Sequence, residues 1–195
     1  MLRDSLNSAL EIRWTKPLIF ALCLAPGLVM AWSWVRFGLG TDIIQVAVRR
    51  TGEWTLKLQL LTLAVTPLRR FAGLSNLIQF RRMLGLFAFF YSCLHLFAWK
   101  VMHHMPHIGQ FSAWNLRLAF VAFVLMIPLA VTSTAGCIQW LGGKLWRMLH
   151  SLIYASAILG YVHYCAITES SARPVALGGV LASLLILRLL PIKNS

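Results

Sequence analysis

Residues 145–166, LWRMLHSLIYASAILGYVHYCA, form a long apolar run that carries two histidines, His150 and His163. At about 1.5 Å and about 100° per residue, a helix would separate the two imidazole rings by roughly 20 Å and turn them to different faces. In a helix that crosses a membrane, one histidine would then lie near each leaflet. Ionisable side chains are costly at membrane depth, so we interpret both histidines as functional residues.

The composition of the whole chain is that of a membrane protein. Of its 195 residues, 59% are hydrophobic and 12% are charged, whereas about 25% are charged in a typical soluble domain. The formal charge of +13 comes from short basic clusters between apolar runs and not from one continuous stripe. This pattern argues against nucleic-acid binding and follows the positive-inside rule. We therefore predict an all-α, polytopic membrane helix bundle.

Six apolar runs are expected to be transmembrane helices. They occupy residues 17–37, 53–68, 83–101, 114–131, 145–166 and 174–190, and residues 38–52 are expected to be a connection with a short amphipathic helix. Residues 1–16 would form an N-terminal cytosolic tail, and residues 17–195 one transmembrane domain. Six spans place both termini on one side of the membrane. Four arginines flank the loop after the second span and mark that side as cytosolic, namely Arg69, Arg70, Arg81 and Arg82.

His95 lies about twelve residues into the third span, which runs outward like the fifth. His95 and His163 are therefore expected at matching depth in the outer half of the membrane. Neutral imidazole is a common axial ligand of haem iron, so this pair could hold one b-type haem whose propionates face the outer interface. The alternative is that each histidine only forms a hydrogen bond with a neighbouring helix. We favour haem because two histidines share one depth.

His150 has no histidine partner at its own depth near the cytosolic face. Arg81 and Arg82 occupy the corresponding part of the third span, fourteen and thirteen residues before His95. A second haem there would need a weak or non-histidine ligand. Otherwise His150 could bind a flavin or a quinone, or cap a haem propionate. The two arginines could be topogenic charges only, but guanidinium groups also bind propionates and flavin phosphates well. We predict that His150, Arg81 and Arg82 form an electron-input site separate from the outer haem.

The remaining histidines and the cysteines have simpler interpretations. His103, His104 and His107 fall in a polar loop and are expected to be solvated and not to bind a metal. Four cysteines, Cys23, Cys93, Cys137 and Cys165, show no CxxC spacing and are expected to be small packing residues.

Several short motifs together resemble a known family. They are Thr51-Gly52, Thr66-Pro67-Leu68, RRMLGL at 81–86, Leu94-His95-Leu96, Thr132-Ser133-Thr134, LGGKLW at 141–146, Leu149-His150, Tyr154 and His163-Tyr164. From about residue 40 to the C-terminus, the chain resembles the haem-binding membrane subunits of the bacterial protein-methionine-sulfoxide reductase system (the MsrQ family). This family belongs to the ferric-reductase-like transmembrane superfamily.

The resemblance implies a multi-pass b-type cytochrome of the bacterial inner membrane. Its cofactors would be haem b and, in some accounts, FMN. It would pass electrons from the quinone pool or a reduced flavin to a periplasmic, molybdopterin-containing catalytic subunit, with which it forms a heterodimer. His95, His150 and His163 fall on the family's histidine positions and would be its haem iron ligands. The first 40 residues match weakly and receive no role.

Two other classes of protein compete with this interpretation. A small transporter would show broken helices with paired polar residues in matching halves, for which Pro26-Gly27 and Pro128 give only faint support. A membrane assembly factor would carry no cofactor. The sequence also lacks the Gly-rich fingerprint of a nucleotide-binding domain. We therefore expect an electron-transfer subunit without catalytic residues of its own, which takes electrons from a separate donor and delivers them to a separate acceptor.

Overall fold

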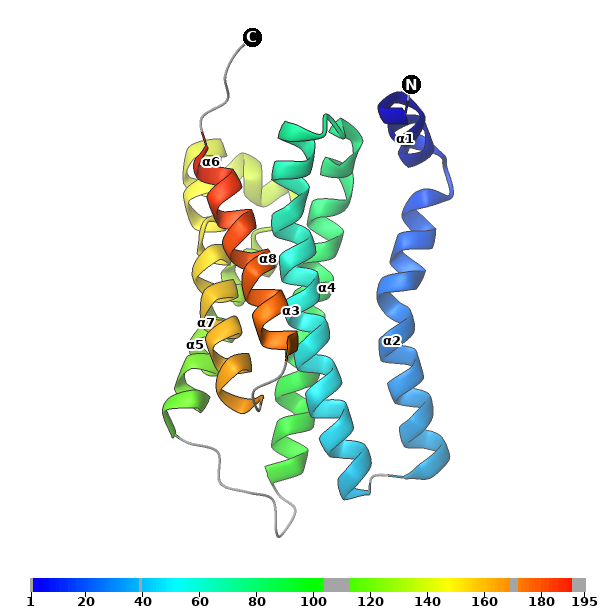
Figure 1. Cartoon of the computed structure of the whole chain (residues 1–195), viewed down its shortest axis with the longest axis vertical. Coiled ribbons are helices and arrows are strands. Elements are labelled where there is room, and N and C mark those ends of the chain that lie inside the picture. Colours follow the sequence, from blue (N-terminus) through cyan, green and yellow to red (C-terminus); the bar gives the residue numbers. More distant parts are fainter. Residues whose placement is uncertain (1, 39, 104–112, 169–171, 191–195) are drawn as a thin grey trace.

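The computed structural model describes residues 2–38, 40–103, 113–168 and 172–190 (Figure 1). All secondary-structure elements in these ranges are helices, which confirms the all-α prediction. In chain order they are α1 (Leu2–Glu11), α2 (Thr15–Phe37), α3 (Thr41–Phe71), η1 (Ser75–Leu77), α4 (Ile78–His103), α5 (Ala113–Val131), α6 (Ala135–His150), α7 (Leu152–Ile167) and α8 (Ala172–Leu189).

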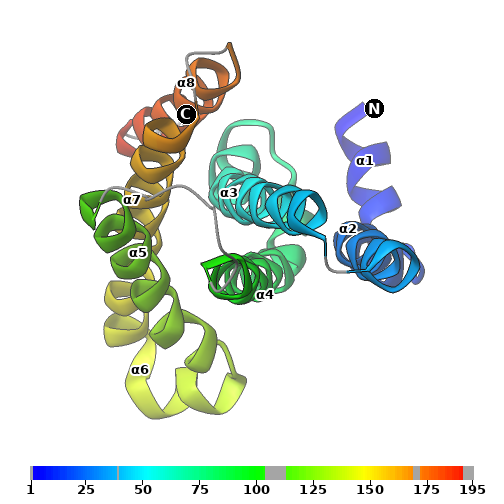
Figure 2. The ribbon, with the colours of Figure 1, turned by 90° about the horizontal axis from the view of Figure 1, so that it is seen from below.

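The bundle is built around two helix pairs. Helix α3 packs along α4, and α5 packs along α7, while α8 lies against α3 and α7. Helices α1 and α2 lie on the far side of the α3–α4 pair (Figure 2). One apolar core joins α3, α5, α7 and α8 through residues such as Leu60, Leu129, Ala157 and Leu181. The two pairs are therefore held together by apolar packing from four helices.

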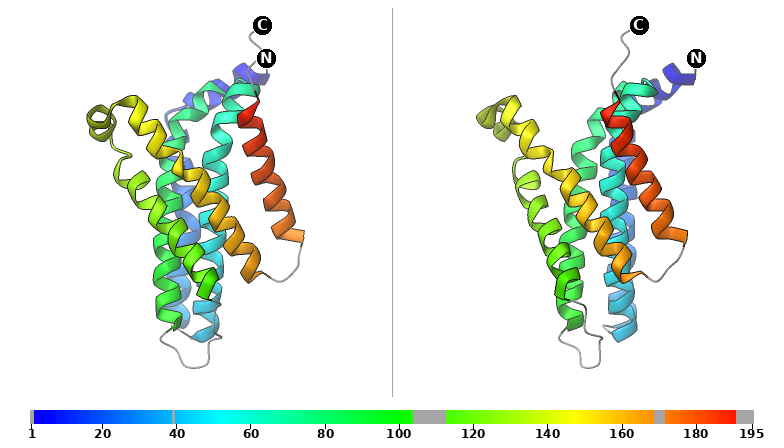
Figure 3. Two further views of the ribbon diagram at one scale, coloured as in Figure 1. Left: turned by 90° about the vertical axis from the view of Figure 1, so that its left-hand side faces the viewer. Right: turned by 60° about the vertical axis from the view of Figure 1, so that its left-hand side comes forward.

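Helix α1 and the last turn of α8 lie at the same end of the bundle, which we call the terminal end (Figure 1). The chain runs along the bundle in α2, α3, α4, α5, α6–α7 and α8, and its direction reverses each time (Figure 3). This arrangement agrees with termini on one side of a membrane.

Four helical segments are long and apolar enough to cross a membrane, within the residues that the structure describes. They are Thr15–Phe37, Ser75–Met102, Trp114–Val131 and Ala172–Leu189. These segments correspond to the predicted first, third, fourth and sixth spans. The predicted second and fifth spans fall on α3 and α7, which do not meet the same criteria of length and hydropathy. Six spans therefore remain a prediction, while four are supported directly.

Helix α3 differs from its prediction. Residues 41–52 form the first three turns of this 31-residue helix and not a separate connection. The predicted amphipathic helix does begin at Thr41, but it continues without a break into the predicted second span, and charged pairs stabilise it at the junction. Glu53 lies 3.5 Å from Arg49 and 3.3 Å from Lys57, and both are i,i+4 pairs. At about 1.5 Å per residue, α3 is about 46 Å long, enough to cross a bilayer with its headgroups.

The fifth predicted span is divided into α6 and α7. Gly142 has φ 72° and ψ 151°, a conformation that favours glycine, and α6 is kinked at this residue. The apolar run of the fifth predicted span therefore begins just after this kink. A second division falls at Ser151, whose φ of −71° and ψ of −18° are still helical. His150 is thus the last residue of α6, and His163 lies in α7.

Helix α2 is attached through Tyr91 of α4. Pro26 has no N–H and weakens the helical hydrogen-bond ladder around it. The Tyr91 hydroxyl donates to the Cys23 carbonyl at 2.8 Å and accepts from the Gly27 N–H at 2.9 Å. These two backbone groups bond each other in a regular helix, so the hydroxyl bridges the ladder at this point.

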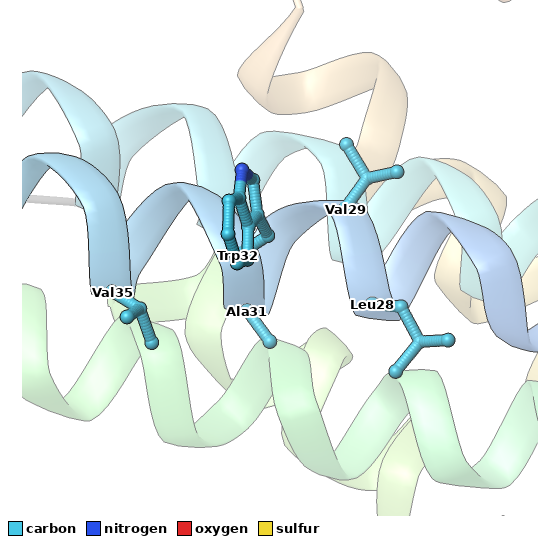
Figure 4. A pocket seen from close by; sticks show the side chains of 5 residues that line it. All are labelled: Leu28, Val29, Ala31, Trp32 and Val35. Atoms are coloured by element: carbon cyan, nitrogen blue, oxygen red, sulfur yellow. The ribbon is translucent and has the colours of Figure 1, made fainter.

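The rest of α2 is largely exposed. A shallow groove on it is lined by Leu28, Val29, Ala31, Trp32 and Val35 (Figure 4). Apart from the indole N–H of Trp32, these side chains are apolar. The groove is therefore suited to contact with lipid acyl chains and not to catalysis.

Candidate functional site

His95 of α4 is held by the backbone of α3. Its Nδ1 lies 2.8 Å from the Val48 carbonyl oxygen and 3.4 Å from the Thr51 hydroxyl. A carbonyl can only accept, so Nδ1 carries the proton and donates to it. The lone pair of the neutral ring therefore lies on Nε2, where it is available to a metal. Thr51 is 1% exposed, and its hydroxyl donates to the carbonyls of Ala47 and Val48.

Gly52 lets the two helices approach each other at this point. A Cβ atom added at Gly52 would lie 3.0 Å from Cε1 and 3.1 Å from Nδ1 of His95. Contacts this short are tighter than nine in ten of those that real Cβ atoms make, so the ring would have to move by a few tenths of an ångström. The glycine therefore leaves the space that the imidazole ring occupies.

His163 of α7 faces His95 across the bundle. The centres of the two imidazole rings lie 6.4 Å apart, with an angle of 71° between the ring planes. Two metal–nitrogen bonds of about 2 Å each, with about 1 Å from each nitrogen to its ring centre, span about 6 Å in total. The separation of the rings therefore fits one iron ion between two imidazoles. The structure thus brings together the two histidines that were expected at matching depth.

Asn115 lies beside His163 and has a buried side-chain oxygen that lacks a partner. This oxygen forms no hydrogen bond in the described part of the chain. The Asn115 backbone acts on the His163 ring as a hydrogen-bond partner. Buried polar atoms are nearly always satisfied, so an unpaired one beside a proposed ligand is consistent with a site that holds a further group.

His150 lies at the terminal end in different surroundings. Its ring stacks on the Trp146 indole, with ring centres 4.0 Å apart, and its Nε2 lies 3.1 Å from the Thr132 hydroxyl. The Thr132 hydroxyl donates its own hydrogen to the Pro128 carbonyl at 2.6 Å. Thr132 must therefore accept from His150, which places the proton on Nε2 and the lone pair on Nδ1. The free nitrogen of His150 is thus the opposite one to that of His95.

Sequence analysis placed Arg81 and Arg82 beside His150, and the structure supports this placement only for Arg81. Arg81 is partly buried and its charge acts on His150, whereas Arg82 is exposed. Thr132, Trp146 and Arg81 surround the His150 ring among the described residues, and none of these is a good iron ligand. His150 is thirteen residues from His163, about 20 Å along a helix. The two histidines therefore belong to different parts of the bundle.

The loop histidines and the cysteines do not form a metal site among the described residues. Within the described ranges no group of three or more His, Cys, Asp and Glu side chains could hold a metal ion. His104 and His107 lie outside these ranges, and His103 ends α4. The four cysteines are free. Sequence reasoning gave no role to Val48, Gly52, Thr132 or Trp146, although the last three occur in the motifs quoted above.

Comparison with known proteins identifies the class of protein that has this arrangement. A family model described as "Ferric reductase like transmembrane component" matches residues 50–161, a range that includes His95, His150 and both arginines. The chain is therefore a ferric-reductase-like transmembrane protein.

The relatives of the chain narrow this class. The chain is 40% identical over 181 residues to a protein of Herminiimonas arsenicoxydans, with 89% of this chain and 83% of the relative covered. It is 38% identical to a protein of Rhodospirillum rubrum (89% and 86% covered) and 37% identical to one of Caulobacter vibrioides (88% and 84% covered). All three relatives are named protein-methionine-sulfoxide reductase heme-binding subunit MsrQ. The chain belongs to the MsrQ family.

Proposed function

We propose that this protein is a b-type cytochrome subunit that carries electrons across the bacterial inner membrane for the repair of methionine sulfoxide. The observation that carries the proposal is the distance of 6.4 Å between the His95 and His163 rings. The heme-binding name of the relatives supports the same cofactor. His95 and His163 would be the two axial ligands of one haem b.

The residues around this pair would position the ligands. The Val48 carbonyl fixes the tautomer and the rotation of the His95 ring, and Gly52 leaves room for that ring. A haem bound here would supply a one-electron carrier in the outer half of the membrane. The protein itself would hold the imidazoles in place, so that little rearrangement is needed when charge arrives.

We assign the electron-input role to His150 with Arg81, and Arg82, its exposed neighbour in the chain, stays a predicted member of this site. The lone pair on His150 Nδ1 can accept a proton from a quinol or a reduced flavin as that donor is oxidised. Trp146 and Thr132 would keep the ring in this orientation. An arginine would bind an anionic group such as a haem propionate or the phosphate of FMN. A second haem is the weaker alternative, because no described residue beside His150 is suited to be its other ligand.

The direction of transfer follows from topology. In this proposal α3 and the α6–α7 segment are the two further membrane crossings, and the termini are cytosolic. Arg69, Arg70, Arg81 and Arg82 at the terminal end support this orientation through the positive-inside rule. Electrons would then leave from the opposite side to a periplasmic, molybdopterin-containing catalytic subunit. The names of the relatives support a protein-methionine-sulfoxide reductase as this partner.

One measurement separates this function from a transporter or a cofactor-free assembly factor. The full-length protein is expressed with an adequate supply of haem, purified in detergent and reduced with dithionite. We expect a red protein with a sharp visible α band and about one haem per chain by the pyridine haemochrome assay. A colourless, well-folded preparation would contradict the proposal.

A further inference from the structure

Four arginines from three helices meet at the terminal end of the bundle. Arg69 and Arg70 lie in the last turn of α3, Arg81 lies in the first turn of α4 and Arg188 lies in the last turn of α8. Arg188 interacts electrostatically with Arg70 and Arg81, and Arg81 interacts with Arg69. Arg70 Nη1 also donates to the Arg188 backbone carbonyl at 3.4 Å. Packing therefore brings like charges together.

No acidic side chain neutralises this cluster from the same helices. Helices α4, α7 and α8 contain no Asp or Glu, and the last acidic residue of α3 is Glu53, sixteen residues before Arg69. Sixteen residues correspond to about 24 Å of helix. Glu53 is already paired with Arg49 and Lys57. Positive charges held together in this way attract anions.

Two buried donors in this cluster lack partners. Arg188 lies over the Tyr154 ring, with its guanidinium carbon 4.4 Å from the ring centre. Arg188 Nη1 and the Tyr154 hydroxyl are both buried, and neither forms a hydrogen bond with a described residue. Buried donors are nearly always satisfied in folded proteins. An acceptor with several oxygens would satisfy both.

We propose that Arg70, Arg81, Arg188 and the Tyr154 hydroxyl bind a phosphate group at the terminal end of the bundle. Phosphate offers several acceptor oxygens, and guanidinium groups match its geometry better than ammonium groups do. Two sources have this chemistry: the headgroup of an anionic phospholipid and the phosphate of FMN. Tyr154 is four residues from His150, about one helical turn, so the anion would lie beside the proposed electron-input site. This inference rests on the electron-input role proposed above for Arg81, but its test does not depend on haem binding.

The test compares the two sources on the full-length protein. In one arm, native mass spectrometry measures retention of phosphatidylglycerol against zwitterionic phosphatidylcholine. In the other, fluorescence titration compares FMN with riboflavin, which has the same ring and no phosphate. We expect the wild-type protein to prefer phosphatidylglycerol over phosphatidylcholine, or FMN over riboflavin, by about tenfold or more.

Three variants connect the preference to the site. Arg188→Gln removes a charge, Tyr154→Phe removes only a hydroxyl, and Arg173→Gln is the matched control at the other end of α8. Arg188→Gln and Tyr154→Phe should each lose most of the preference, and Arg173→Gln should keep it. A wild-type protein with no preference in either arm would overturn the proposal. So would folded Arg188→Gln and Tyr154→Phe variants that keep it. If Arg188→Gln does not fold, Tyr154→Phe decides, because its ring packing is preserved.

Discussion

Gly52 of α3 lies against the imidazole ring of His95 on α4, so closely that a Cβ atom at Gly52 would come within 3.0 Å of the ring. The ring has little freedom to give way, because its Nδ1 is bonded to the Val48 carbonyl at 2.8 Å. This contact connects the packing of two helices directly to the orientation of a proposed haem ligand.

Replacing Gly52 with Val should therefore lower haem binding. The added side chain would push the His95 ring away from its bond with Val48 and from the position opposite His163. We expect haem content to fall by more than half and the electron paramagnetic resonance spectrum of the remaining haem to change. Haem per chain is measured by the pyridine haemochrome assay.

Gly85→Ala in α4 is the matched control for this substitution. A Cβ atom at Gly85 would meet only the Thr62 methyl carbon, at an ordinary contact distance of 3.8 Å. Its haem content should stay at the wild-type level. A Gly52→Val protein with full haem and an unchanged spectrum would show that the close contact does not matter for the ligand.

Removal of either proposed ligand should have a stronger effect. His95→Ala and His163→Ala each delete one of the two axial imidazoles, so haem content should fall sharply in both variants. The measurement is the reduced-minus-oxidised spectrum, normalised to protein. Full occupancy with unchanged spectra in both variants would rule out this ligand pair.

The sequence predicted those features of the site that follow from the position of a residue along its own helix. Depth along a helix follows from counting residues, so His95 and His163 could be placed opposite each other without a structure. The contact of Gly52 with His95 depends on how α3 and α4 are aligned, which no residue count contains. The same is true of Arg188, which reaches Tyr154 only because α8 packs beside α7.

The boundaries of α3 illustrate a second reason for failure. The sequence suggested a connection with a short amphipathic helix over residues 38–52, followed by a separate span from residue 53. In the structure, Arg49 and Lys57 both pair with Glu53, so these charges support one continuous helix across the predicted boundary at residues 52 and 53. Hydropathy alone does not distinguish a charged helical turn from a loop.

Tyr91→Phe should loosen the attachment of α2. The substitution removes the hydroxyl that bonds the Cys23 carbonyl and the Gly27 N–H beside Pro26. Leaving these groups unsatisfied should cost about 1–3 kcal/mol, observed as a lower midpoint of thermal unfolding in detergent. Tyr164→Phe is a suitable control, because it also removes a phenol hydroxyl from a buried ring and should have little effect. Equal stability of the two variants would contradict this role for Tyr91.

The proposed orientation can be tested with single cysteines in a cysteine-free background. Position 76 lies in η1 at the terminal end, and position 107 lies in the loop that was predicted to be periplasmic. A membrane-impermeant maleimide added to intact spheroplasts should label position 107 and not position 76. Labelling at 76 but not at 107 would invert the orientation, and the direction of electron transfer with it.

His150→Ala should separate electron input from haem binding. His150 lies about 20 Å along the helix from His163, and its Nε2 is bonded to Thr132. Loss of this ring should leave the absorption spectrum of the outer haem largely intact. It should also slow haem reduction by a quinol or a reduced flavin about tenfold or more, because a proton acceptor at the donor is gone. Stopped-flow absorbance at the α band measures this rate.

Thr132→Val, which keeps the imidazole but removes its hydrogen-bond acceptor, should slow reduction less. If His150→Ala instead removes all haem, His150 belongs to the main ligand set and the proposed division between the two ends is wrong.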